Sequence, residues 1–213
     1  MSNGQTITQL EESRQVEQSR LDGERTQPER NRLGQFATPA TLARAIARLA
    51  RRHWSAGRRV HFLDPGVGTG AFYAALREEF PRRQVAGALG VEVDEDVAAV
   101  TKQLWGKDGL DVRVGDFTKL RIPSDAAQAN LILANPPYVR HHHLAPEEKR
   151  RLQARVASEL GLRISGLAGL YCYFLLLCDR WLEPGGLAAW LIPSEFFDVN
   201  YGRVIREYLT HQV

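Results

Sequence analysis

The sequence predicts an α/β fold in which helices cover both faces of a doubly wound, mostly parallel sheet. Short apolar segments alternate with segments of helical period along most of the chain. A glycine-rich loop follows the first apolar segment and precedes a helix, as expected where a strand meets a ligand-binding turn. With 213 residues, 44% of them hydrophobic, the chain can bury one sizeable core.

The first 33 residues are expected to form a polar arm outside the folded core, which then spans residues 34–213. Acidic residues and arginines nearly balance in this arm, and the apolar stripe around Ile7 to Leu21 is thin. We therefore expect no more than a surface helix there, mobile or dependent on a partner.

The folded core should begin with a helix capped by Thr38, with Pro39 at its first position. Its buried face is expected to carry Leu42, Ile46 and Leu49, and its arginines to face solvent. Strand and helix patterns then alternate. They predict strands over 60–63, 85–93, 112–114, 131–134 and 187–192, and helices over 39–53, 71–80, 95–104, 146–160, 166–182 and 201–209.

Several features exclude other kinds of protein. Cys172 and Cys178 lie six positions apart in one helical pattern, so they should be reduced core thiols rather than a disulfide. Neither has a cysteine or histidine three or four residues away, and no metal site is expected. No apolar stretch approaches the ~20 residues of a membrane span. The first residues lack the apolar region of a signal peptide, so we expect a cytoplasmic protein without membrane contact.

Basic residues gather in two parts of the chain, although the formal net charge is only +3. Taken alone, each cluster is explained better by a solvated face than by nucleic-acid binding, and the arginines of the first, over 40–60, fall on the solvent face of a predicted helix. The second, over 139–163, includes the loop from Arg140 to His143 and the run from Lys149 to Arg151. We expect the loop from Arg140 to His143, with Lys149 to Arg151 nearby, to contact nucleic-acid phosphates.

Three segments at predicted strand ends indicate a nucleoside cofactor without a pyrophosphate. The loop behind Asp64 places Gly66 and Gly68 where backbone can approach a ligand closely, and its alternating glycines depart from the G-x-G-x-x-G pattern. Glu92 ends the next strand, where a carboxylate can bind ribose hydroxyls. The third segment is Gly115-Asp116-Phe117.

These three segments resemble the motifs of the class I S-adenosylmethionine-dependent methyltransferases, which have a Rossmann-like core. The resemblance implies an S-adenosylmethionine pocket along the carboxyl edge of the sheet. The residues that it assigns to the cofactor are Asp64, Gly66 and Gly68 at the methionine part, Glu92 at the ribose, and Val93, Asp116 and Phe117 at the adenine.

The segment Asn135-Pro136-Pro137-Tyr138 follows an apolar strand and predicts a catalytic role for these four residues. The prolines fix φ and remove two N–H donors, so Asn135 and the Pro136 carbonyl offer acceptors to an incoming amino group. Such acceptors can draw out the delocalised lone pair of an amine or amide nitrogen and aim it at a methyl donor. Tyr138 would stack on a planar group, which requires base flipping if that group belongs to duplex DNA.

This tetrapeptide is shared by methyltransferases of DNA adenine, of protein glutamine and of some RNA bases. The segment Gln35 to Pro39 resembles the N-terminal motif of the N6-adenine DNA methyltransferases, and residues 168–197 resemble the methylases of restriction-modification systems. The resemblance implies Thr38 at the methionine end, double-stranded DNA as substrate, and a specificity or restriction subunit or domain as partner. The leading hypothesis is a site-specific N6-adenine DNA methyltransferase core. A protein-glutamine or RNA amino-methyltransferase and a non-catalytic module are the alternatives.

The resemblance spans residues 34–213. Members of that family continue with further strands, an aromatic residue that packs against the flipped base, and a target-recognition domain. We therefore expect the sheet to lack the family's C-terminal strands, and the chain alone to methylate DNA weakly or not at all.

Overall fold

The described residues form a sheet of five strands, all parallel, in the order β3-β2-β1-β4-β5. This computed structural model describes residues 5–24, 26, 34, 36–122, 127–194 and 202–211. The predicted doubly wound α/β fold is confirmed. The strands are β1 (Val60–Asp64), β2 (Val85–Glu92), β3 (Asp111–Val114), β4 (Ala129–Ala134) and β5 (Leu182–Trp190).

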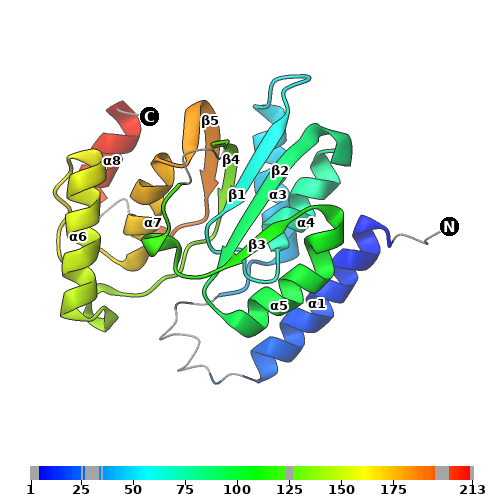
Figure 1. Cartoon of the computed structure of the whole chain (residues 1–213), viewed down its shortest axis with the longest axis horizontal. Helices are drawn as coiled ribbons and strands as arrows, with labels where there is room; N and C mark the ends of the chain where they lie inside the picture. Colours follow the sequence, from blue (N-terminus) through cyan, green and yellow to red (C-terminus); the bar gives the residue numbers. More distant parts are fainter. Residues whose placement is uncertain are drawn as a thin grey trace.

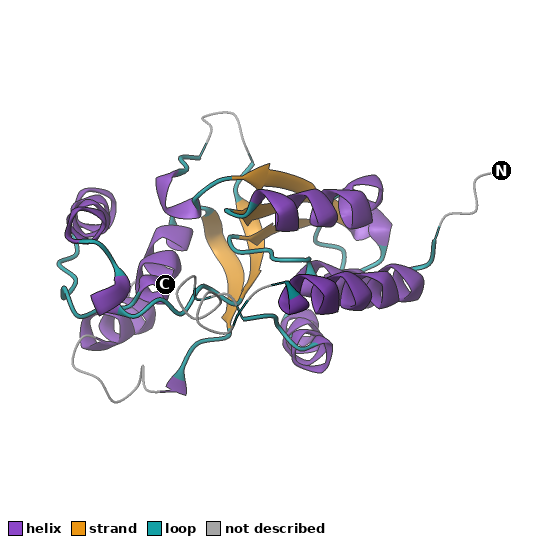
Figure 2. Cartoon of the chain, turned by 90° about the horizontal axis from the view of Figure 1, so that it is seen from below, coloured by secondary structure: helices purple, strands orange, loops and turns teal. Residues whose placement is uncertain are grey.

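Helices cover both faces of this sheet (Figures 1 and 2). Adjacent residues of β1 show the two faces, because Phe62 packs with α3, α4 and α5 whereas Leu63 packs with α6, α7 and α8. Burial on both sides explains why the central strands are continuous apolar runs. The helices are α3 (Ala40–Arg52), α4 (Ala71–Glu79), α5 (Glu95–Trp105), α6 (Pro146–Leu160), α7 (Leu170–Asp179) and α8 (Gly202–His211). Single 3-10 turns lie at Arg82–Gln84, Gly106–Asp108, Phe117–Lys119 and His141–His143.

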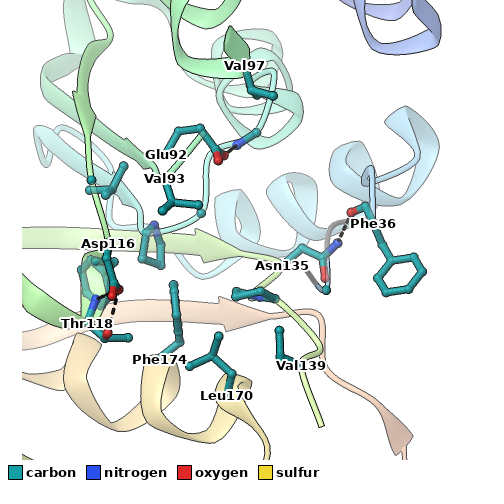
Figure 3. A pocket seen from close by; sticks show the side chains of 18 of the residues that line it. Phe36, Glu92, Val93, Val97, Asp116, Thr118, Asn135, Val139, Leu170 and Phe174 are labelled. Atoms are coloured by element: carbon teal, nitrogen blue, oxygen red, sulfur yellow. Dashed lines mark hydrogen bonds between the residues drawn. The ribbon is translucent and has the colours of Figure 1, made fainter. Parts of the chain in front are cut away.

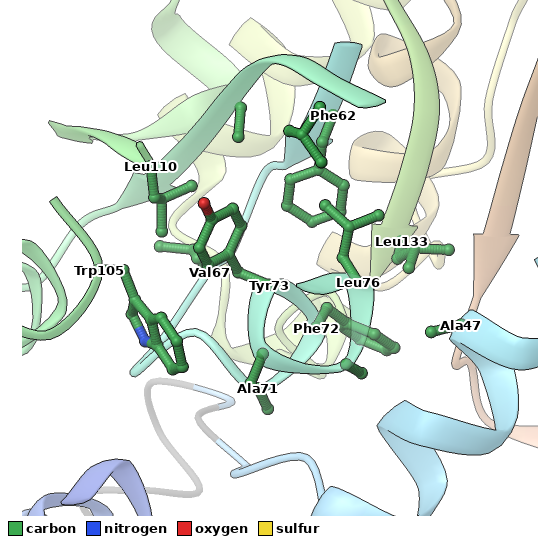
Figure 4. Close-up of a cluster of buried hydrophobic side chains, with 14 of the residues drawn as sticks. Ala47, Phe62, Val67, Ala71, Phe72, Tyr73, Leu76, Trp105, Leu110 and Leu133 are labelled. Carbon is green, nitrogen blue, oxygen red and sulfur yellow. The ribbon is translucent and has the colours of Figure 1, made fainter. Parts of the chain in front are cut away.

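Aromatic side chains fill the core beneath the loop that joins β1 to α4 (Figure 4). Tyr73 and Trp105 are fully buried, with ring centroids 5.5 Å apart in an edge-on arrangement. The indole Nε1 of Trp105 donates a hydrogen bond to the carbonyl of Thr69 (2.9 Å), and Thr101 Oγ1 donates one to the carbonyl of Gly68 (2.6 Å). The core therefore fixes the position of the glycine loop.

The N-terminal arm contains the expected helix, α1 (Ile7–Gly23), but this helix packs on the outside of α4 and α5. Only 8% of the surface of Leu10 and 5% of that of Leu21 is exposed to solvent. Thr6 and Gln9 form a capping box at its start, in which each side chain accepts a hydrogen bond from the other residue's backbone N–H. This segment is part of the packed fold and not the loose arm that the sequence predicts.

Of the predicted buried face of α3, only Ile46 packs against the core, where it is partly buried. Its buried residues are all alanines, whereas Leu42 and Leu49 are exposed. Alanines allow α3 to approach α4 closely, and there Arg44 forms an ion pair with Glu78 (2.8 Å). The contact surface is therefore set by small side chains and charge pairs, which a search for large apolar residues does not find.

The bounds of α7 and β5 also differ from the prediction. α7 begins at Leu170, four residues late, because Gly169 before it is extended (φ −72°, ψ 165°). β5 begins at Leu182, five residues early. Leu182 pairs with Ala129, and the next pair joins Leu187 to Leu131. The intervening segment, which includes Pro184–Gly186, therefore forms a bulge within a longer strand.

Candidate active site

A cavity of about 430 Å³ opens at the carboxyl ends of the strands (Figure 3). Gly66 follows β1, Glu92 ends β2, Asp116 follows β3 and Asn135 follows β4, and all four line the cavity. Ligands of open parallel sheets bind at this edge, where the strand order reverses. The structure brings the four predicted segments together at one site.

Asp64, the last residue of β1, lies beneath the glycine loop. Only 1% of its surface is exposed, and its Oδ1 accepts a hydrogen bond from the backbone N–H of Gly66 (3.1 Å). Burial and, to a smaller extent, the charge of Glu92 raise the pKa of Asp64 to about 8. Asp64 and Thr38 line a smaller cavity that shares Gly66 with the main one.

Glu92 is held by backbone donors. Its Oε2 accepts a hydrogen bond from the N–H of Gly68 (3.0 Å) and its Oε1 accepts one from the N–H of Asp94 (2.9 Å). Burial raises the pKa of Glu92, although these hydrogen bonds act in the opposite direction. Val93, which follows, is largely exposed and also lines the cavity. Each carboxylate oxygen keeps a further lone pair, so Glu92 can still accept from ligand hydroxyls.

One end of the cavity combines Asp116 with two aromatic rings. Asp116 Oδ1 accepts hydrogen bonds from the backbone N–H (2.8 Å) and the hydroxyl (2.6 Å) of Thr118. Phe117 is buried, and its ring centroid lies 5.4 Å from that of Phe174 in α7. Figure 3 shows Asp116 and Thr118 at the opposite end of the cavity from Asn135. This end suits a flat ring with a polar edge.

Two arginines of α6 hold the loop that carries Asp116. Arg151 donates hydrogen bonds to the carbonyl (2.8 Å) and hydroxyl (2.6 Å) oxygens of Thr118. Arg155 donates to the same carbonyl and to the carbonyl of Leu120 (2.6 Å). Each arginine also pairs with a glutamate of its own helix. Arg151, which the sequence places near the predicted phosphate-contacting loop, therefore binds within the fold, as does Arg155.

Asn135 is held by a segment nearly a hundred positions earlier in the chain. Its Nδ2 donates hydrogen bonds to the carbonyl of Phe36 (3.1 Å) and to Thr38 Oγ1 (3.1 Å), and its Oδ1 accepts one from the Tyr138 hydroxyl. Thr38 is therefore a hydrogen-bond acceptor for Asn135 and not the N-cap of α3, a position taken by Pro39. Because both amide hydrogens are bound within the protein, the orientation of the amide oxygen is fixed.

The other predicted catalytic residues occupy different surroundings. Pro137 lines the cavity, and Pro136 is buried. Tyr138 stacks on Phe36, with ring centroids 6.0 Å apart and planes inclined at 29°, and burial raises its pKa to about 12. One stacking position at Tyr138 is therefore taken by Phe36 in this structure.

Sequence reasoning missed one wall of the cavity. Gln18, Leu21 and Asp22 of α1 line it, although the prediction places α1 outside the core. Phe36 and Phe174 line it as well. The available signal for α1 was its capping-box pattern, which marks the start of a stable helix.

The histidine loop lies at the rim of the site. His141–His143 form an exposed 3-10 turn, and His143 lines the cavity. Partial desolvation and nearby positive charges, including Arg140, lower the pKa of His142. A contact between this loop and phosphates stays a prediction.

Cys172 and Cys178 are buried free thiols in α7, as predicted. Within the described ranges, no group of three His, Cys, Asp or Glu side chains is arranged to hold a metal ion. No helix in the described part of the chain has the length and apolar character needed to cross a membrane.

Comparisons with known proteins agree with this geometry. A family model described as Eco57I restriction-modification methylase matches residues 90–213. The Type II methyltransferase M.XamI of Xanthomonas campestris pv. amaranthicola is 32% identical over 187 residues, covering 85% of this chain and 34% of that relative. A release factor glutamine methyltransferase of Geobacter sulfurreducens is 30% identical over 134 residues, covering 61% of this chain and 43% of that relative. This chain therefore spans less than half the length of either relative.

Among solved structures, a Listeria monocytogenes protein described as a class I S-adenosylmethionine-dependent methyltransferase superposes with a TM-score of 0.75. The sequences are 15% identical, and the match covers 96% of this chain and 59% of that one, so it shows a shared fold. The family model, in contrast, matches more than half of the sequence itself. The chain belongs to the Eco57I restriction-modification methylase family.

Proposed function

We propose that this chain is the catalytic core of a site-specific DNA methyltransferase that transfers a methyl group from S-adenosylmethionine to the N6 amine of a flipped adenine. The observation that carries the proposal is the position of Asn135. Its side chain is held by hydrogen bonds in the wall of a cavity that also contains the glycine loop and two acidic strand ends.

The cavity fits the chemistry of the cofactor. The rings of Phe117 and Phe174 flank one end, beside Asp116, which suits an adenine with its polar edge. Glu92 lies where it can accept hydrogen bonds from a ribose diol. Gly66 has open space in front of it, with the nearest atom to a hypothetical Cβ at 3.9 Å, so a ligand can approach the backbone there. When bound, S-adenosylmethionine supplies an electrophilic methyl group on a sulfonium.

The residues of the catalytic segment prepare the amine for attack. Asn135 Oδ1 and the Pro136 carbonyl accept the two N6 hydrogens, which moves the nitrogen toward tetrahedral geometry and directs its lone pair into the cavity. A bound cofactor would offer its methyl carbon to this lone pair with S-adenosylhomocysteine as the leaving group, and the methylated nitrogen would lose one proton to water. No strong base is required before the attack.

DNA adenine is the favoured substrate because the chain belongs to a restriction-modification methylase family and M.XamI is among its relatives. The shared stretch is 34% of M.XamI, and we propose that a further domain or subunit provides sequence recognition. A protein-glutamine methyltransferase is the second candidate, since the Geobacter relative carries that description and the same acceptors would serve an amide nitrogen.

The test is methyl transfer by the purified chain, with labelled S-adenosylmethionine and, in parallel, mixed duplex DNA, RNA and a glutamine-containing peptide. We expect only weak label in DNA from the chain alone, recovered as N6-methyldeoxyadenosine after digestion, and a further loss of about 10²-fold or more in Asn135→Ala. Asp64→Ala should lose cofactor binding, whereas Asn135→Ala should keep it.

Other outcomes would replace the proposal. Label only in the peptide would establish the second candidate, and label only in RNA would overturn both. Cofactor binding without transfer to any substrate would identify a non-catalytic module, in which the missing step depends on a partner.

A further inference from the structure

α1 lies beside the glycine loop as well as against the core. It packs on α4 and α5, the two helices that begin just after the glycine loop and just after Glu92 (Figure 1). Its buried leucines hold its inner face, so its polar residues on that side are brought to the cavity at fixed positions. Together with Thr69 of the glycine loop, these polar residues form a continuous chain of hydrogen bonds.

The first part of this chain is a buried ion pair. Arg14 donates two hydrogen bonds to Glu11, at 2.6 and 2.7 Å, and each residue is only 3% exposed. Arg14 Nη1 also donates to Thr69 Oγ1 in the glycine loop (3.1 Å). Breaking a buried pair of this kind is strongly destabilising, so Arg14 ties α1 to the loop in a fixed geometry.

The second part reaches the cavity. Gln18 Oε1 accepts a hydrogen bond from the Thr69 hydroxyl (2.8 Å), and Gln18 Nε2 donates one to Asp22 Oδ1 (3.0 Å). Gln18 and Asp22 both line the main cavity, and Gln18 also lines the smaller cavity with Asp64. Gln18, Asp22 and Thr69 together form a polar wall of the cavity, next to Gly68 of the glycine loop. The aromatic rings that suit an adenine belong instead to the segment after β3 and to α7.

The polar wall adjoins the glycine loop, beside which the family resemblance places the methionine part of the cofactor. S-adenosylmethionine ends in an amino acid, with an ammonium group and a carboxylate. A carboxylate such as Asp22 binds an ammonium, and an amide N–H or a hydroxyl binds a carboxylate. We propose, resting on the function above, that Gln18 and Asp22 of α1 bind the amino-acid end of the cofactor, while Arg14 and Thr69 position Gln18.

The test compares two ligands that differ only at this end. S-adenosylhomocysteine has the amino acid, whereas 5′-methylthioadenosine keeps the adenine, ribose and sulfur and lacks it. Binding of each to the full chain is measured by calorimetry for the wild type and for Asp22→Asn and Gln18→Ala. We expect each variant to bind S-adenosylhomocysteine about tenfold or more weakly, as for the loss of a charge-assisted hydrogen bond. Binding of 5′-methylthioadenosine should be unchanged within about twofold.

Arg20→Ala is the matched control. Arg20 is on the same helix and pairs with Glu17 and Glu24 at the exposed surface, so its loss should change neither affinity. Unliganded thermal unfolding of each variant shows whether the fold is intact. Both ligands are compared on the same variant. A general loosening of the site would therefore lower the affinity for both, whereas loss of a contact to the amino acid lowers it for S-adenosylhomocysteine alone.

If a variant binds both ligands equally more weakly, or binds both as tightly as the wild type, the inference is overturned and the proposed function still stands. If the wild-type chain binds neither ligand, the proposed function fails and this inference fails with it. Weaker binding of S-adenosylhomocysteine alone in Asp22→Asn and Gln18→Ala, with near wild-type binding in the charge-keeping variant Asp22→Glu, would establish that α1 contacts the cofactor.

Discussion

The phenol oxygen of Tyr138 lies 2.5 Å from Asn135 Oδ1 and 2.8 Å from the carbonyl oxygen of Leu191. Both partners are acceptors, and the hydroxyl has one hydrogen, so it can serve only one of them at a time. When that hydrogen turns to Leu191, the amide oxygen of Asn135 is left free to accept from a substrate amine. The pair therefore links Asn135, the proposed acceptor, to the segment after β5.

Replacing Tyr138 by phenylalanine removes the hydroxyl and keeps the ring, so it distinguishes the contributions of the two groups to activity. Asn135 keeps its two hydrogen bonds to Phe36 and Thr38, and the ring keeps its stacking on Phe36. We expect kcat for methyl transfer to fall by no more than about tenfold, the value of one hydrogen bond, with KM for the cofactor unchanged. Tyr138→Ala should lose considerably more. Equal losses in the two variants would show that the hydroxyl, and not the ring, carries the effect.

Arg155→Met should loosen the loop that carries Asp116. The variant loses the hydrogen bonds to the carbonyls of Thr118 and Leu120, and we expect a loss of about 2 kcal/mol in the free energy of unfolding. Affinity for S-adenosylhomocysteine should fall as well. Denaturant titration and calorimetry measure both quantities.

Arg150→Met is the control for Arg155→Met, since Arg150 sits on the same helix and its ion pair with Glu147 is exposed. Its effect on stability should stay within about 0.5 kcal/mol. Similar losses in both variants would contradict the role of Arg155 in holding the loop.

Cofactor binding should release a proton from Asp64. Its raised pKa, about 8, leaves this carboxyl mostly protonated at pH 7. A positively charged ligand lowers the pKa, so the proton leaves on binding, and affinity should rise with pH up to about 8. Calorimetry at pH 7 in buffers of different ionisation enthalpy measures the release. A signal that persists in Asp64→Asn would assign the proton to another group.

The same shift predicts the opposite trend for stability. A carboxyl whose pKa is raised by folding stabilises the fold fully below its unfolded pKa, and this contribution is lost as pH rises through the folded value. The free energy of unfolding should therefore be lower at pH 8.5 than at pH 5, and the difference should shrink in Asp64→Asn. Denaturant titrations at the two pH values check this. A larger difference in the variant than in the wild type would contradict the assignment.

Gly34→Ala should displace the catalytic segment. Gly34 has φ +64°, and an added Cβ would come within 2.7 Å of the backbone nitrogen of Tyr138, which donates a hydrogen bond to the Gly34 carbonyl. We expect at least a tenfold loss of kcat, as for small misplacements of reacting groups. Gly57→Ala is the matched control because Gly57 also has positive φ (+79°) but nothing lies within 4 Å of an added Cβ. Gly57→Ala should lower the free energy of unfolding by about 1 kcal/mol and leave the activity unchanged.

The parts that the sequence predicts well are those set by local patterns. The strands at 60–64 and 129–134 are buried on both faces, and the acids and glycines at strand ends follow directly from them. The parts missed depend on which distant segments meet. Nothing local shows that Thr38 binds Asn135 rather than capping α3, or that Arg151 binds the carbonyl of Thr118 rather than a phosphate. The cavity wall formed by α1 likewise depends on a contact between segments that are distant in the sequence.

The sheet order also bears on how the chain folds as it is synthesised. β1 pairs with β2 on one side and with β4 on the other, but β4 follows β1 by more than sixty residues. A nascent chain that has reached β3 therefore carries β1 as an open, apolar edge, a template for pairing with another chain. High contact order of this kind slows folding. Delayed closure by β4, which also delivers Asn135, makes the unfinished chain a candidate for chaperone capture until the catalytic segment has emerged.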